Sequence, residues 1–275
     1  MRSAEADLKI SDASLRRVLV KNKLCVMLVT VLPLALAGLL VLHSMCVGQA
    51  APPATGYLHD LTLTSKFIAR DFTPDGDLSK RVWKGAPRVK YDNEVRDEKA
   101  FPDSETQVAS LWTADYLYLG YRCRYRSLND YEGEDIAKER FGLWYRDTAE
   151  AFINPEPERI NHYYEFEVAP NNQWVDLEID ISEKYSGNVH WDSNFEHATK
   201  IDAKHHVWTA EMKIPVKSMG GNALQTGTFW RLNLYRLDGL GDDPQRRFLS
   251  WSPLPPGNNR SFHQPASFGI IKFVR

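Results

Sequence analysis

Carboxylate and aromatic side chains concentrate between residues 144 and 180, and these are residue types that bind sugars or cations. Two alternating runs, HYYEFEV and WVDLEIDI, flank the turn-forming APNNQ and predict a β-hairpin over 162–181. One face is expected to be apolar and the other to carry five carboxylates beside two aromatic rings. The faces are Tyr164, Phe166, Val168, Val175, Leu177, Ile179 and Ile181, against Tyr163, Glu165, Glu167, Trp174, Asp176, Glu178 and Asp180.

Such an acidic face calls for a partner, because like charges on neighbouring strands repel each other. Arginine side chains, a hard metal ion or a polyhydroxylated sugar would each relieve the repulsion, whereas a solvated outer face is the alternative. Asp75 and Asp77 flank Gly76 in a predicted turn. With the acidic hairpin they offer the oxygen ligands that calcium prefers. The spacing after Asp77 departs from an EF-hand loop, so turn chemistry alone also accounts for these two residues.

The first fifty residues are predicted to be an export segment. The basic stretch RRVLVKNK precedes an apolar run from Leu24 to Leu42, and small residues follow at Gly48 and Ala50. This order is typical of a signal peptide cleaved after about Ala50, although the run is also long enough for an uncleaved signal anchor. In both cases residues 51–275 are expected to be exported, as a periplasmic, cell-surface or secreted domain.

Composition restricts the remaining classes. The chain has 275 residues and a net charge of −2, which argues against a nucleic-acid partner. Membrane contact is expected only through an uncleaved N-terminal segment. Cys123 is the single cysteine after residue 50, so the predicted domain has neither an internal disulfide nor a zinc-type cysteine cluster. The length after residue 50 is sufficient for one hydrophobic core.

Further alternating runs fill the chain between residues 106 and 275. They include QVASLWTADYLYLGYRCRYR, VWTAEMKIPV, TFWRLNLYRLD and SFGIIKFV, separated by Gly, Pro and Asn. In TFWRLNLYRLD, Trp230, Leu232 and Leu234 are expected to face the core. Short helices are expected only within 78–83, 130–141 and 216–219. The fold class is therefore predicted to be all-β, a single antiparallel β-sandwich.

The order of these motifs resembles the family 9 carbohydrate-binding modules, relatives of the DOMON sandwich domains. The resemblance rests on DGDLSKRVW, SLWTADYLYLGYRC, WYRDTAEAFINP, HYYEFEVAPNNQWVD, WTAEMKIPV, FWRLNLYR and FLSWSP with SFHQPASFGIIKF, and it spans about residues 60–275. It implies a jelly-roll-like sandwich that binds sugars or polysaccharide ends without catalysis, in carbohydrate catabolism. It also implies that the sugar lies between two tryptophan rings and that calcium supports the structure.

The same resemblance implies a set of sugar-binding residues. They are Trp144 and Trp251 as stacking surfaces, with Glu150 and Asn233 as hydroxyl partners. Arg236 is predicted as a further hydroxyl partner, although alternation places it on the side of Trp230 unless the strand ends first. This chain departs from the family pattern after the central tyrosines, where Glu165 and Glu167 replace a basic and an amide residue.

Two other functions fit parts of the sequence. A glycoside hydrolase needs two carboxylates, which the pairs Asp147/Glu150 and Glu165/Glu167 offer. A haem-binding DOMON-type domain needs axial ligands of the Met and His type. The sequence supplies these at Met212, Met219, His190, His197, His205, His206 and His263. Neither a GxSxG motif nor a CxxCH motif is present, and a non-catalytic function is favoured.

Overall fold

Alternating residues form strands along most of the domain, and the helices between them are short. The computed structural model describes residues 61–95, 99–133, 135–182, 186–255, 257 and 261–275, so the predicted export segment lies outside the described residues. The strands are β1 Thr62–Phe67, β2 Arg88–Tyr91, β3 Thr106–Trp112, β4 Tyr116–Arg124, β5 Thr148–Asn154, β6 His162–Val168, β7 Trp174–Asp180, β8 Ser186–Asn188, β9 Glu196–Asp202, β10 Val207–Pro215, β11 Phe229–Asp238, β12 Arg247–Ser250 and β13 Gly269–Val274.

The helices are single 3-10 turns. They are η1 Arg81–Trp83, η2 Pro102–Ser104, η3 Leu143–Tyr145, η4 Val216–Met219 and η5 Pro265–Ser267. Helical turns therefore occur within two of the predicted segments, whereas the described residues of 130–141 form bends and turns. The prediction that helices occur only in those segments is wrong, because η2, η3 and η5 form in loops outside them. Across the part of the chain described here, no helix has the length and apolar character needed to span a membrane.

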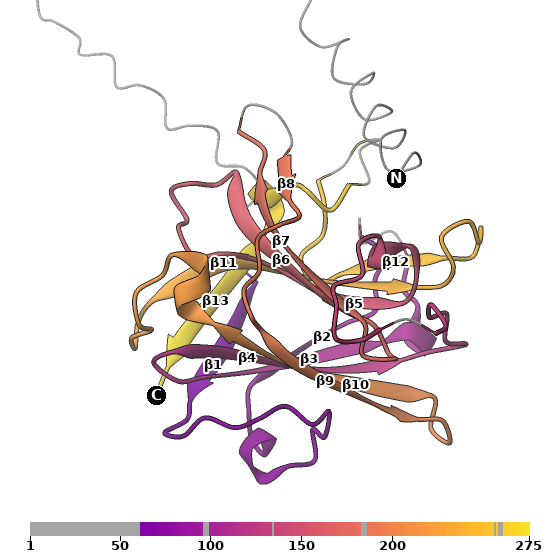
Figure 1. Cartoon of the computed structure of the whole chain (residues 1–275), viewed down its shortest axis with the longest axis horizontal. Helices are drawn as coiled ribbons and strands as arrows, with labels where there is room; N and C mark the ends of the chain where they lie inside the picture. Colours follow the sequence, from indigo (N-terminus) through magenta and orange to yellow (C-terminus); the bar gives the residue numbers. More distant parts are fainter. Residues whose placement is uncertain (1–60, 96–98, 134, 183–185, 256, 258–260) are drawn as a thin grey trace, which may run out of the picture. The chain divides into compact units, whose positions relative to one another are not determined.

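The strands form one curled sheet in the order β8-β7-β6-β5-β11-β13-β1-β3-β4-β10-β9, with β12 added beside β11 and β2 beside β3. Figure 1 shows the sheet folding over so that the half containing β5, β6 and β11 faces the half containing β3, β4 and β10. This confirms the predicted all-β sandwich. Pairing is mostly antiparallel, but β1 runs parallel to both β13 and β3.

The main core lies between the two halves. Leu119 and Tyr121 of β4 and Met212 of β10 pack in the same cluster as Phe166 of β6 and Leu234 of β11, all fully buried. The predicted inward orientation of the apolar residues of β11 is confirmed, because alternate residues of that strand belong to this cluster. A smaller cluster covers the outer face of β5, β6 and β7, and loop residues near the C-terminus complete it.

The β6–β7 hairpin is confirmed, but the predicted division of its faces is wrong. Glu165 pairs with Leu177, and Glu167 pairs with Val175. Directly opposed residues of an antiparallel pair share one face of the sheet. The turn at 169–173 sets a register in which the two glutamates lie on the apolar outer face, while Asp176 lies on the interior face. The single acidic face expected from the sequence therefore does not form.

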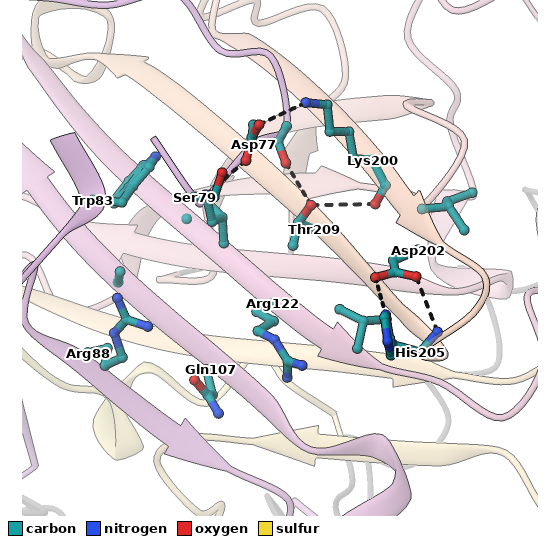
Figure 2. A pocket seen from close by; sticks show the side chains of 16 residues that line it. Asp77, Ser79, Trp83, Arg88, Gln107, Arg122, Lys200, Asp202, His205 and Thr209 are labelled. Carbon is teal, nitrogen blue, oxygen red and sulfur yellow. Dashed lines mark hydrogen bonds and ion pairs between the residues drawn. The ribbon is translucent and has the colours of Figure 1, made fainter. Parts of the chain in front are cut away.

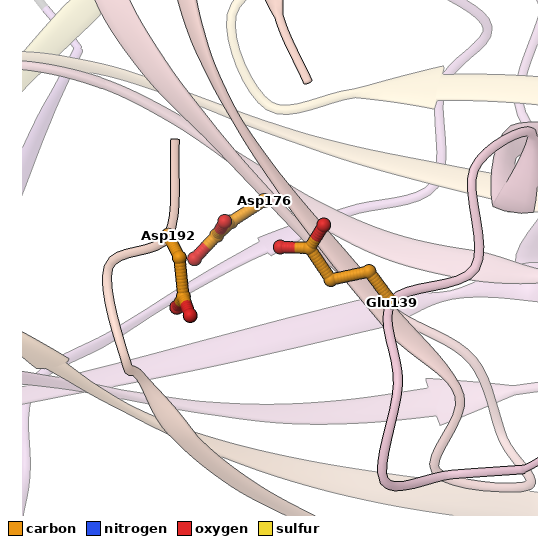
Figure 3. Close-up of side chains that lie close together, drawn as sticks. All are labelled: Glu139, Asp176 and Asp192. Carbon is orange, nitrogen blue, oxygen red and sulfur yellow. The ribbon is translucent and has the colours of Figure 1, made fainter. Parts of the chain in front are cut away.

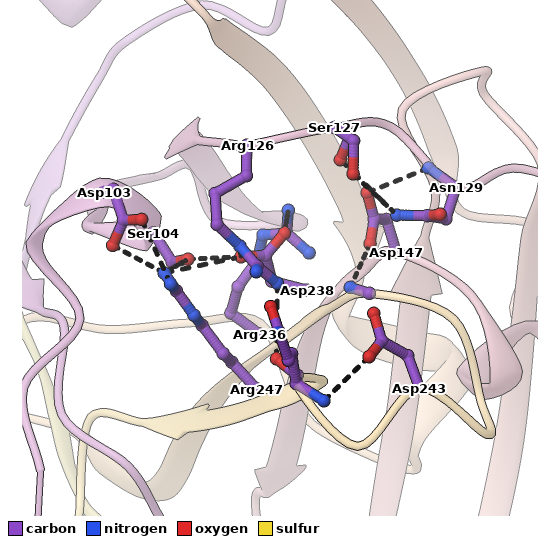
Figure 4. Close-up of polar contacts among 12 residues, drawn as sticks. Asp103, Ser104, Arg126, Ser127, Asn129, Asp147, Arg236, Asp238, Asp243 and Arg247 are labelled. Atoms are coloured by element: carbon purple, nitrogen blue, oxygen red, sulfur yellow. Dashed lines mark hydrogen bonds and ion pairs between the residues drawn. The ribbon is translucent and has the colours of Figure 1, made fainter.

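Buried ionic contacts hold the end of β11 to its neighbours (Figure 4). The Asp238 carboxylate lies 3.6 Å from the Arg126 Nε and 3.7 Å from an Arg236 guanidinium nitrogen. The Asp147 carboxylate, just before β5, accepts the Gly239 amide at 2.6 Å. Removing one member of such a buried set leaves a charge without its partner, which is strongly destabilising. These contacts fix the framework around the outer face of β5 and β11.

Candidate functional site

A pocket of about 230 Å³ opens on the outer face of β5, β6 and β11. Its lining is mostly aromatic and aliphatic, with a few converging polar groups. The lining residues are Trp144, Glu150, Phe152, Glu165, Leu177, Leu237, Arg246, Phe248, Ser261, Phe262 and His263. This composition is that of a small-molecule pocket, and the volume lies below the roughly 300–1,000 Å³ of sites for drug-sized ligands. A ligand the size of one sugar residue suits it.

Strand register builds the floor of the pocket. Glu150 of β5 lies opposite Glu167 of β6 and Tyr235 of β11, and Phe152 lies opposite Glu165. Because side chains alternate along a strand, residues 150 and 152 both project to the outer face. The floor therefore combines carboxylates with aromatic rings.

One wall comes from η3 and the loop before β12. Gly142 at φ 84° supplies the left-handed turn that precedes η3, a conformation that favours glycine. Trp144 follows, half-buried, with Phe141 edge-on at 4.8 Å between ring centroids. The Arg246 guanidinium donates to the Trp144 carbonyl and lies 4.7 Å from the Phe248 ring centroid. These contacts hold the tryptophan at the rim of the pocket.

Three buried glutamates dominate the electrostatics. Glu150, Glu165 and Glu167 are 1%, 4% and 0% exposed, and an oxygen from each lies within 4.8 Å of the other two. Burial raises the pKa of Glu150 to about 8 and that of Glu165 to about 7, and it raises the pKa of Glu167 well above its ordinary value. Glu150 accepts the Thr148 hydroxyl at 2.7 Å. These glutamate side chains are therefore protonated near neutral pH unless a cation binds beside them.

Two of the residues predicted for sugar binding, Trp144 and Glu150, come together in this pocket. The other three lie elsewhere. The Asn233 amide is buried and donates to the Tyr235 hydroxyl at 2.8 Å and to the Ser252 carbonyl at 2.9 Å. Asn233 therefore supports the framework beside the pocket instead of lining it.

Trp251 and Arg236 belong to the interior of the sandwich. Trp251 is 7% exposed, and its ring packs so closely on Gly269 that a Cβ there would lie 2.9 Å from it. The Arg236 guanidinium is fully buried, 5.1 Å from the Trp208 ring centroid. Alternation along β11 directs Arg236 inward, on the same side as Trp230.

Arg246, Phe248, Phe262 and His263 line the pocket but do not stand out in the sequence. Arg246 and residues 261–263 lie in loops, and β12 is only four residues long, so no alternating pattern marks them. The Tyr235 and Phe262 rings are stacked at 4.1 Å. The His263 Nδ1 lies 2.7 Å from the Tyr163 hydroxyl, and burial lowers the pKa of His263 to about 4. The imidazole is therefore neutral at physiological pH.

A second hollow of about 730 Å³ lies over β4, β9 and β10 (Figure 2). Lys200 there is paired with Asp77 at 3.2 Å, and His205 with Asp202 at 2.6 Å. No side chain that lines this hollow belongs to the acidic clusters found in the described residues. The smaller pocket is therefore the stronger candidate site.

The two aspartates predicted to bind calcium have other partners. The Lys80 ammonium lies 2.8 Å from the Asp75 carboxylate. Asp77 accepts the Ser79 amide at 2.9 Å as well as Lys200, and these contacts hold the pKa of Asp77 at about 2. The turn that these residues form is therefore accounted for by hydrogen bonds within the protein.

Another acidic cluster offers a better set of oxygen ligands. Figure 3 shows Glu139, Asp176 and Asp192 converging, and an oxygen from each lies within 4.8 Å of the other two. Asp176 is fully buried, and its Oδ2 accepts the Ser193 amide at 3.0 Å. Its Oδ1 has no hydrogen-bond partner among the described residues. An oxygen-only set with an unpartnered buried carboxylate oxygen fits calcium.

Solved structures share this fold. A Bacteroides uniformis protein described as a candidate carbohydrate-binding protein is 19% identical, covers 77% of this chain and 98% of its own, and superposes with a TM-score of 0.62. A family 9 carbohydrate-binding module from Caldicellulosiruptor kristjanssonii superposes with a TM-score of 0.55, both in complex with cellotriose (15% identity, 78% of this chain and 94% of that one) and in complex with glucose (16%, 78% and 97%). The fold is therefore that of a family 9-type β-sandwich.

Sequence comparison agrees with the fold. The model of the family described as carbohydrate family 9 binding domain-like matches residues 75–275, and the chain belongs to this family. An Arthroderma benhamiae relative named "Extracellular protein" is 25% identical over 201 residues, which are 68% of this chain and 85% of the relative.

Proposed function

We propose that the protein is an exported, non-catalytic carbohydrate-binding protein that holds one sugar residue in the pocket above Glu150. The observation that carries this proposal is the convergence of Trp144 and Glu150 in a pocket with aromatic walls. A pyranose ring presents apolar C–H faces that stack on aromatic rings, and hydroxyl groups that bond to carboxylates and guanidinium groups. Complexes of the Caldicellulosiruptor module with glucose and cellotriose support the ligand class.

The proposed contacts follow the pocket. Trp144 supplies a stacking surface, and Glu150 and Arg246 supply hydroxyl partners. Arg246 takes the role that the sequence assigned to Arg236, because its guanidinium lies in the pocket wall. Phe248 and Phe262 supply further aromatic surface, the role expected for Trp251. Capture of polysaccharide ends for catabolism is the biological role that this site would serve.

Binding without hydrolysis is the better-supported activity. A glycoside hydrolase places its two carboxylates on either side of the scissile bond. Here the two carboxyl groups that line the pocket, Glu150 and Glu165, instead lie beside each other on the neighbouring strands β5 and β6. The methionines considered as haem ligands, Met212 and Met219, are packed in the main core. Release of reducing sugar from an oligosaccharide by the purified protein would contradict the proposal.

Export and calcium binding complete the proposed function. The name of the Arthroderma relative supports a location outside the cell, reached through an export segment within residues 1–50. Calcium would be held by Glu139, Asp176 and Asp192, where it would neutralise three neighbouring carboxylates. Its role would be structural, because it would tie the segments at 139 and 192 to β7.

Isothermal titration calorimetry with glucose and cellotriose tests the proposed site. Trp144→Ala and Glu150→Gln should each weaken binding about five- to a hundredfold, which corresponds to about 1–3 kcal/mol. Phe229→Ala is a matched control, because Phe229 is an exposed aromatic residue outside the pocket. Thermal melting shows whether each variant is folded. Unchanged affinity in both folded pocket variants would place the ligand elsewhere.

A further inference from the structure

The pocket floor has more carboxylate than the surrounding protein neutralises. Glu150 and Glu167 face each other on adjacent strands, and Glu165 lies two positions along β6, all of them buried. Ionised carboxylates away from water are unfavourable unless a positive group or hydrogen-bond donors approach them. Such a cluster on an otherwise apolar face therefore needs a specific partner.

Hydrogen bonds within the protein leave much of this cluster unsatisfied. The Glu165 Oε2 and both Glu167 carboxylate oxygens are buried, and among the described residues their one available hydrogen bond is between Glu165 and Glu167 themselves, when one of the two is protonated. Of the three glutamates, the Thr148 hydroxyl donates only to Glu150. A buried acceptor without a partner is costly, so these oxygens mark a place where a donor from outside the chain would bind.

Positive charge inside the pocket is also scarce. Among the described residues that line the pocket, Arg246 is the single Lys or Arg, and its guanidinium already bonds to the Trp144 carbonyl. His263 is held neutral by burial. Arg236 lies in the interior core on the other side of β11, beside Trp208. One described guanidinium lies beside three carboxyl groups that burial keeps protonated, so a cationic group from outside the chain is the partner that would let them ionise.

The walls indicate which kind of cation fits. A divalent metal ion prefers oxygen ligands around its whole sphere. Here Phe152, Phe248, Phe262 and Trp144 occupy much of the lining instead. Aromatic rings attract ammonium groups through their negative faces and also stack on the apolar faces of a sugar. A lining that combines carboxyl groups with aromatic rings therefore suits an organic ammonium ion on a carbohydrate.

We propose that the pocket selects a sugar residue with a free primary amine, a deacetylated amino sugar, and binds its ammonium group between Glu150, Glu165 and Glu167. This inference rests on the proposed function, because it names the class of sugar that the same pocket binds. An ammonium group brings three donors and one positive charge to the unpartnered oxygens. An acetylated amine brings one donor and no charge, and a hydroxyl also brings one donor.

Proton linkage follows from the same arrangement. Burial keeps the glutamates protonated near neutral pH, and a positive charge beside them favours their ionised form. Binding of an amino sugar that is already protonated should therefore release protons from the cluster. A neutral sugar has no charge with which to cause this release.

Calorimetry of the purified protein with glucosamine, glucose and N-acetylglucosamine tests the inference. The titrations contain a chelator at about pH 6.5, below the roughly 7.7–8.0 typical of an α-amino group, so that the amine is protonated. Glucosamine should bind about tenfold or more tightly than the other two sugars. The measured binding enthalpy of glucosamine should vary between buffers of different ionisation enthalpy, because released protons bind to the buffer.

Variants of the cluster test the role of the glutamates. In Glu165→Gln, and in Glu167→Gln if that variant folds, the ratio of glucosamine to glucose affinity should fall towards one. Glu178→Gln on the same hairpin should leave the ratio unchanged.

The possible results separate this inference from the proposed function. If glucose binds as tightly as glucosamine and Trp144→Ala weakens both, the pocket binds sugars but the amine selectivity is wrong. If none of the three sugars binds, the proposed function and the inference both fail. If calcium titrated into the chelator-free protein binds at a site that Glu165→Gln removes and Asp176→Asn retains, a metal ion occupies the cluster and the inference is wrong.

Discussion

Glu150 of β5 lies directly opposite Glu167 of β6, and both carboxylates are buried on the apolar outer face of the sheet. In their ionised forms these facing carboxylates would repel each other, and burial would add the loss of hydration. The Glu150–Glu167 pair is therefore not explained by strand stability. Glu150 lines the pocket that also contains Trp144 and Arg246, and a Glu167 oxygen lies within 4.8 Å of a Glu150 oxygen beside that pocket, which ties this unfavourable arrangement to ligand binding.

The buried glutamates should make stability depend on pH. Their folded-state pKa values are raised above the unfolded value near 4.5, to about 8 for Glu150 and about 7 for Glu165. Between pH 4.5 and 8 the folded state binds more protons than the unfolded state, so the free energy of unfolding falls as the pH rises. The contribution of these glutamates to that free energy is full below about pH 4.5 and is lost as the pH approaches 8. Urea unfolding at several pH values should show a smaller loss in Glu150→Gln than in the wild type. Equal slopes in the two proteins would mean that Glu150 ionises normally.

Arg236 and Arg246 should respond differently to replacement. Arg236→Met removes a fully buried guanidinium beside Asp238 and should lower the free energy of unfolding by about 3–5 kcal/mol. Arg246→Met removes a group from the pocket wall and should weaken sugar binding, with a smaller effect on stability. Denaturant unfolding and calorimetry on both variants distinguish the roles. Loss of sugar affinity in a stable Arg236→Met protein, with Arg246→Met unaffected, would reverse the assignment.

Calcium removal should destabilise the protein through Asp176. A ligand that binds only the folded state stabilises it, by about 2.7 kcal/mol at a hundred times its dissociation constant. Thermal melts with a chelator should therefore show a lower Tm than melts with excess calcium. Asp176→Asn should abolish the difference, whereas Asp77→Asn should retain it, because Asp77 is already paired with Lys200. A wild-type Tm that does not respond to calcium would remove the metal from the proposal.

Export should be visible at the N-terminus of the mature protein. Expression of the full chain in a bacterium, followed by fractionation and N-terminal sequencing, is expected to give a protein outside the cytoplasm that begins at about Ala51. An uncleaved protein in the membrane fraction would identify the segment as an anchor. Accumulation in the cytosol would contradict export.

Strand positions were predictable because alternation is a local property. Trp230, Leu232 and Leu234 repeat at every second residue, and all three face the core as expected. Trp144 and Glu150 are six residues apart, and both line the same pocket because η3 lies only a few residues before β5. The sequence by itself thus determined the fold class and the family motifs, and it placed Trp144 and Glu150 in the candidate site.

Tertiary structure decided the rest, because pairing and burial depend on residues distant in the chain. The turn at 169–173 sets the β6–β7 register, and with it the burial of Glu165 and Glu167. Trp251 stands among polar neighbours in the sequence, yet packing against Gly269 and the main core buries it. Arg246 and Phe262 reach the pocket from loops that carry no periodic signal. Local sequence specifies which way a side chain alternates, but only the packed sheet specifies what that side chain meets.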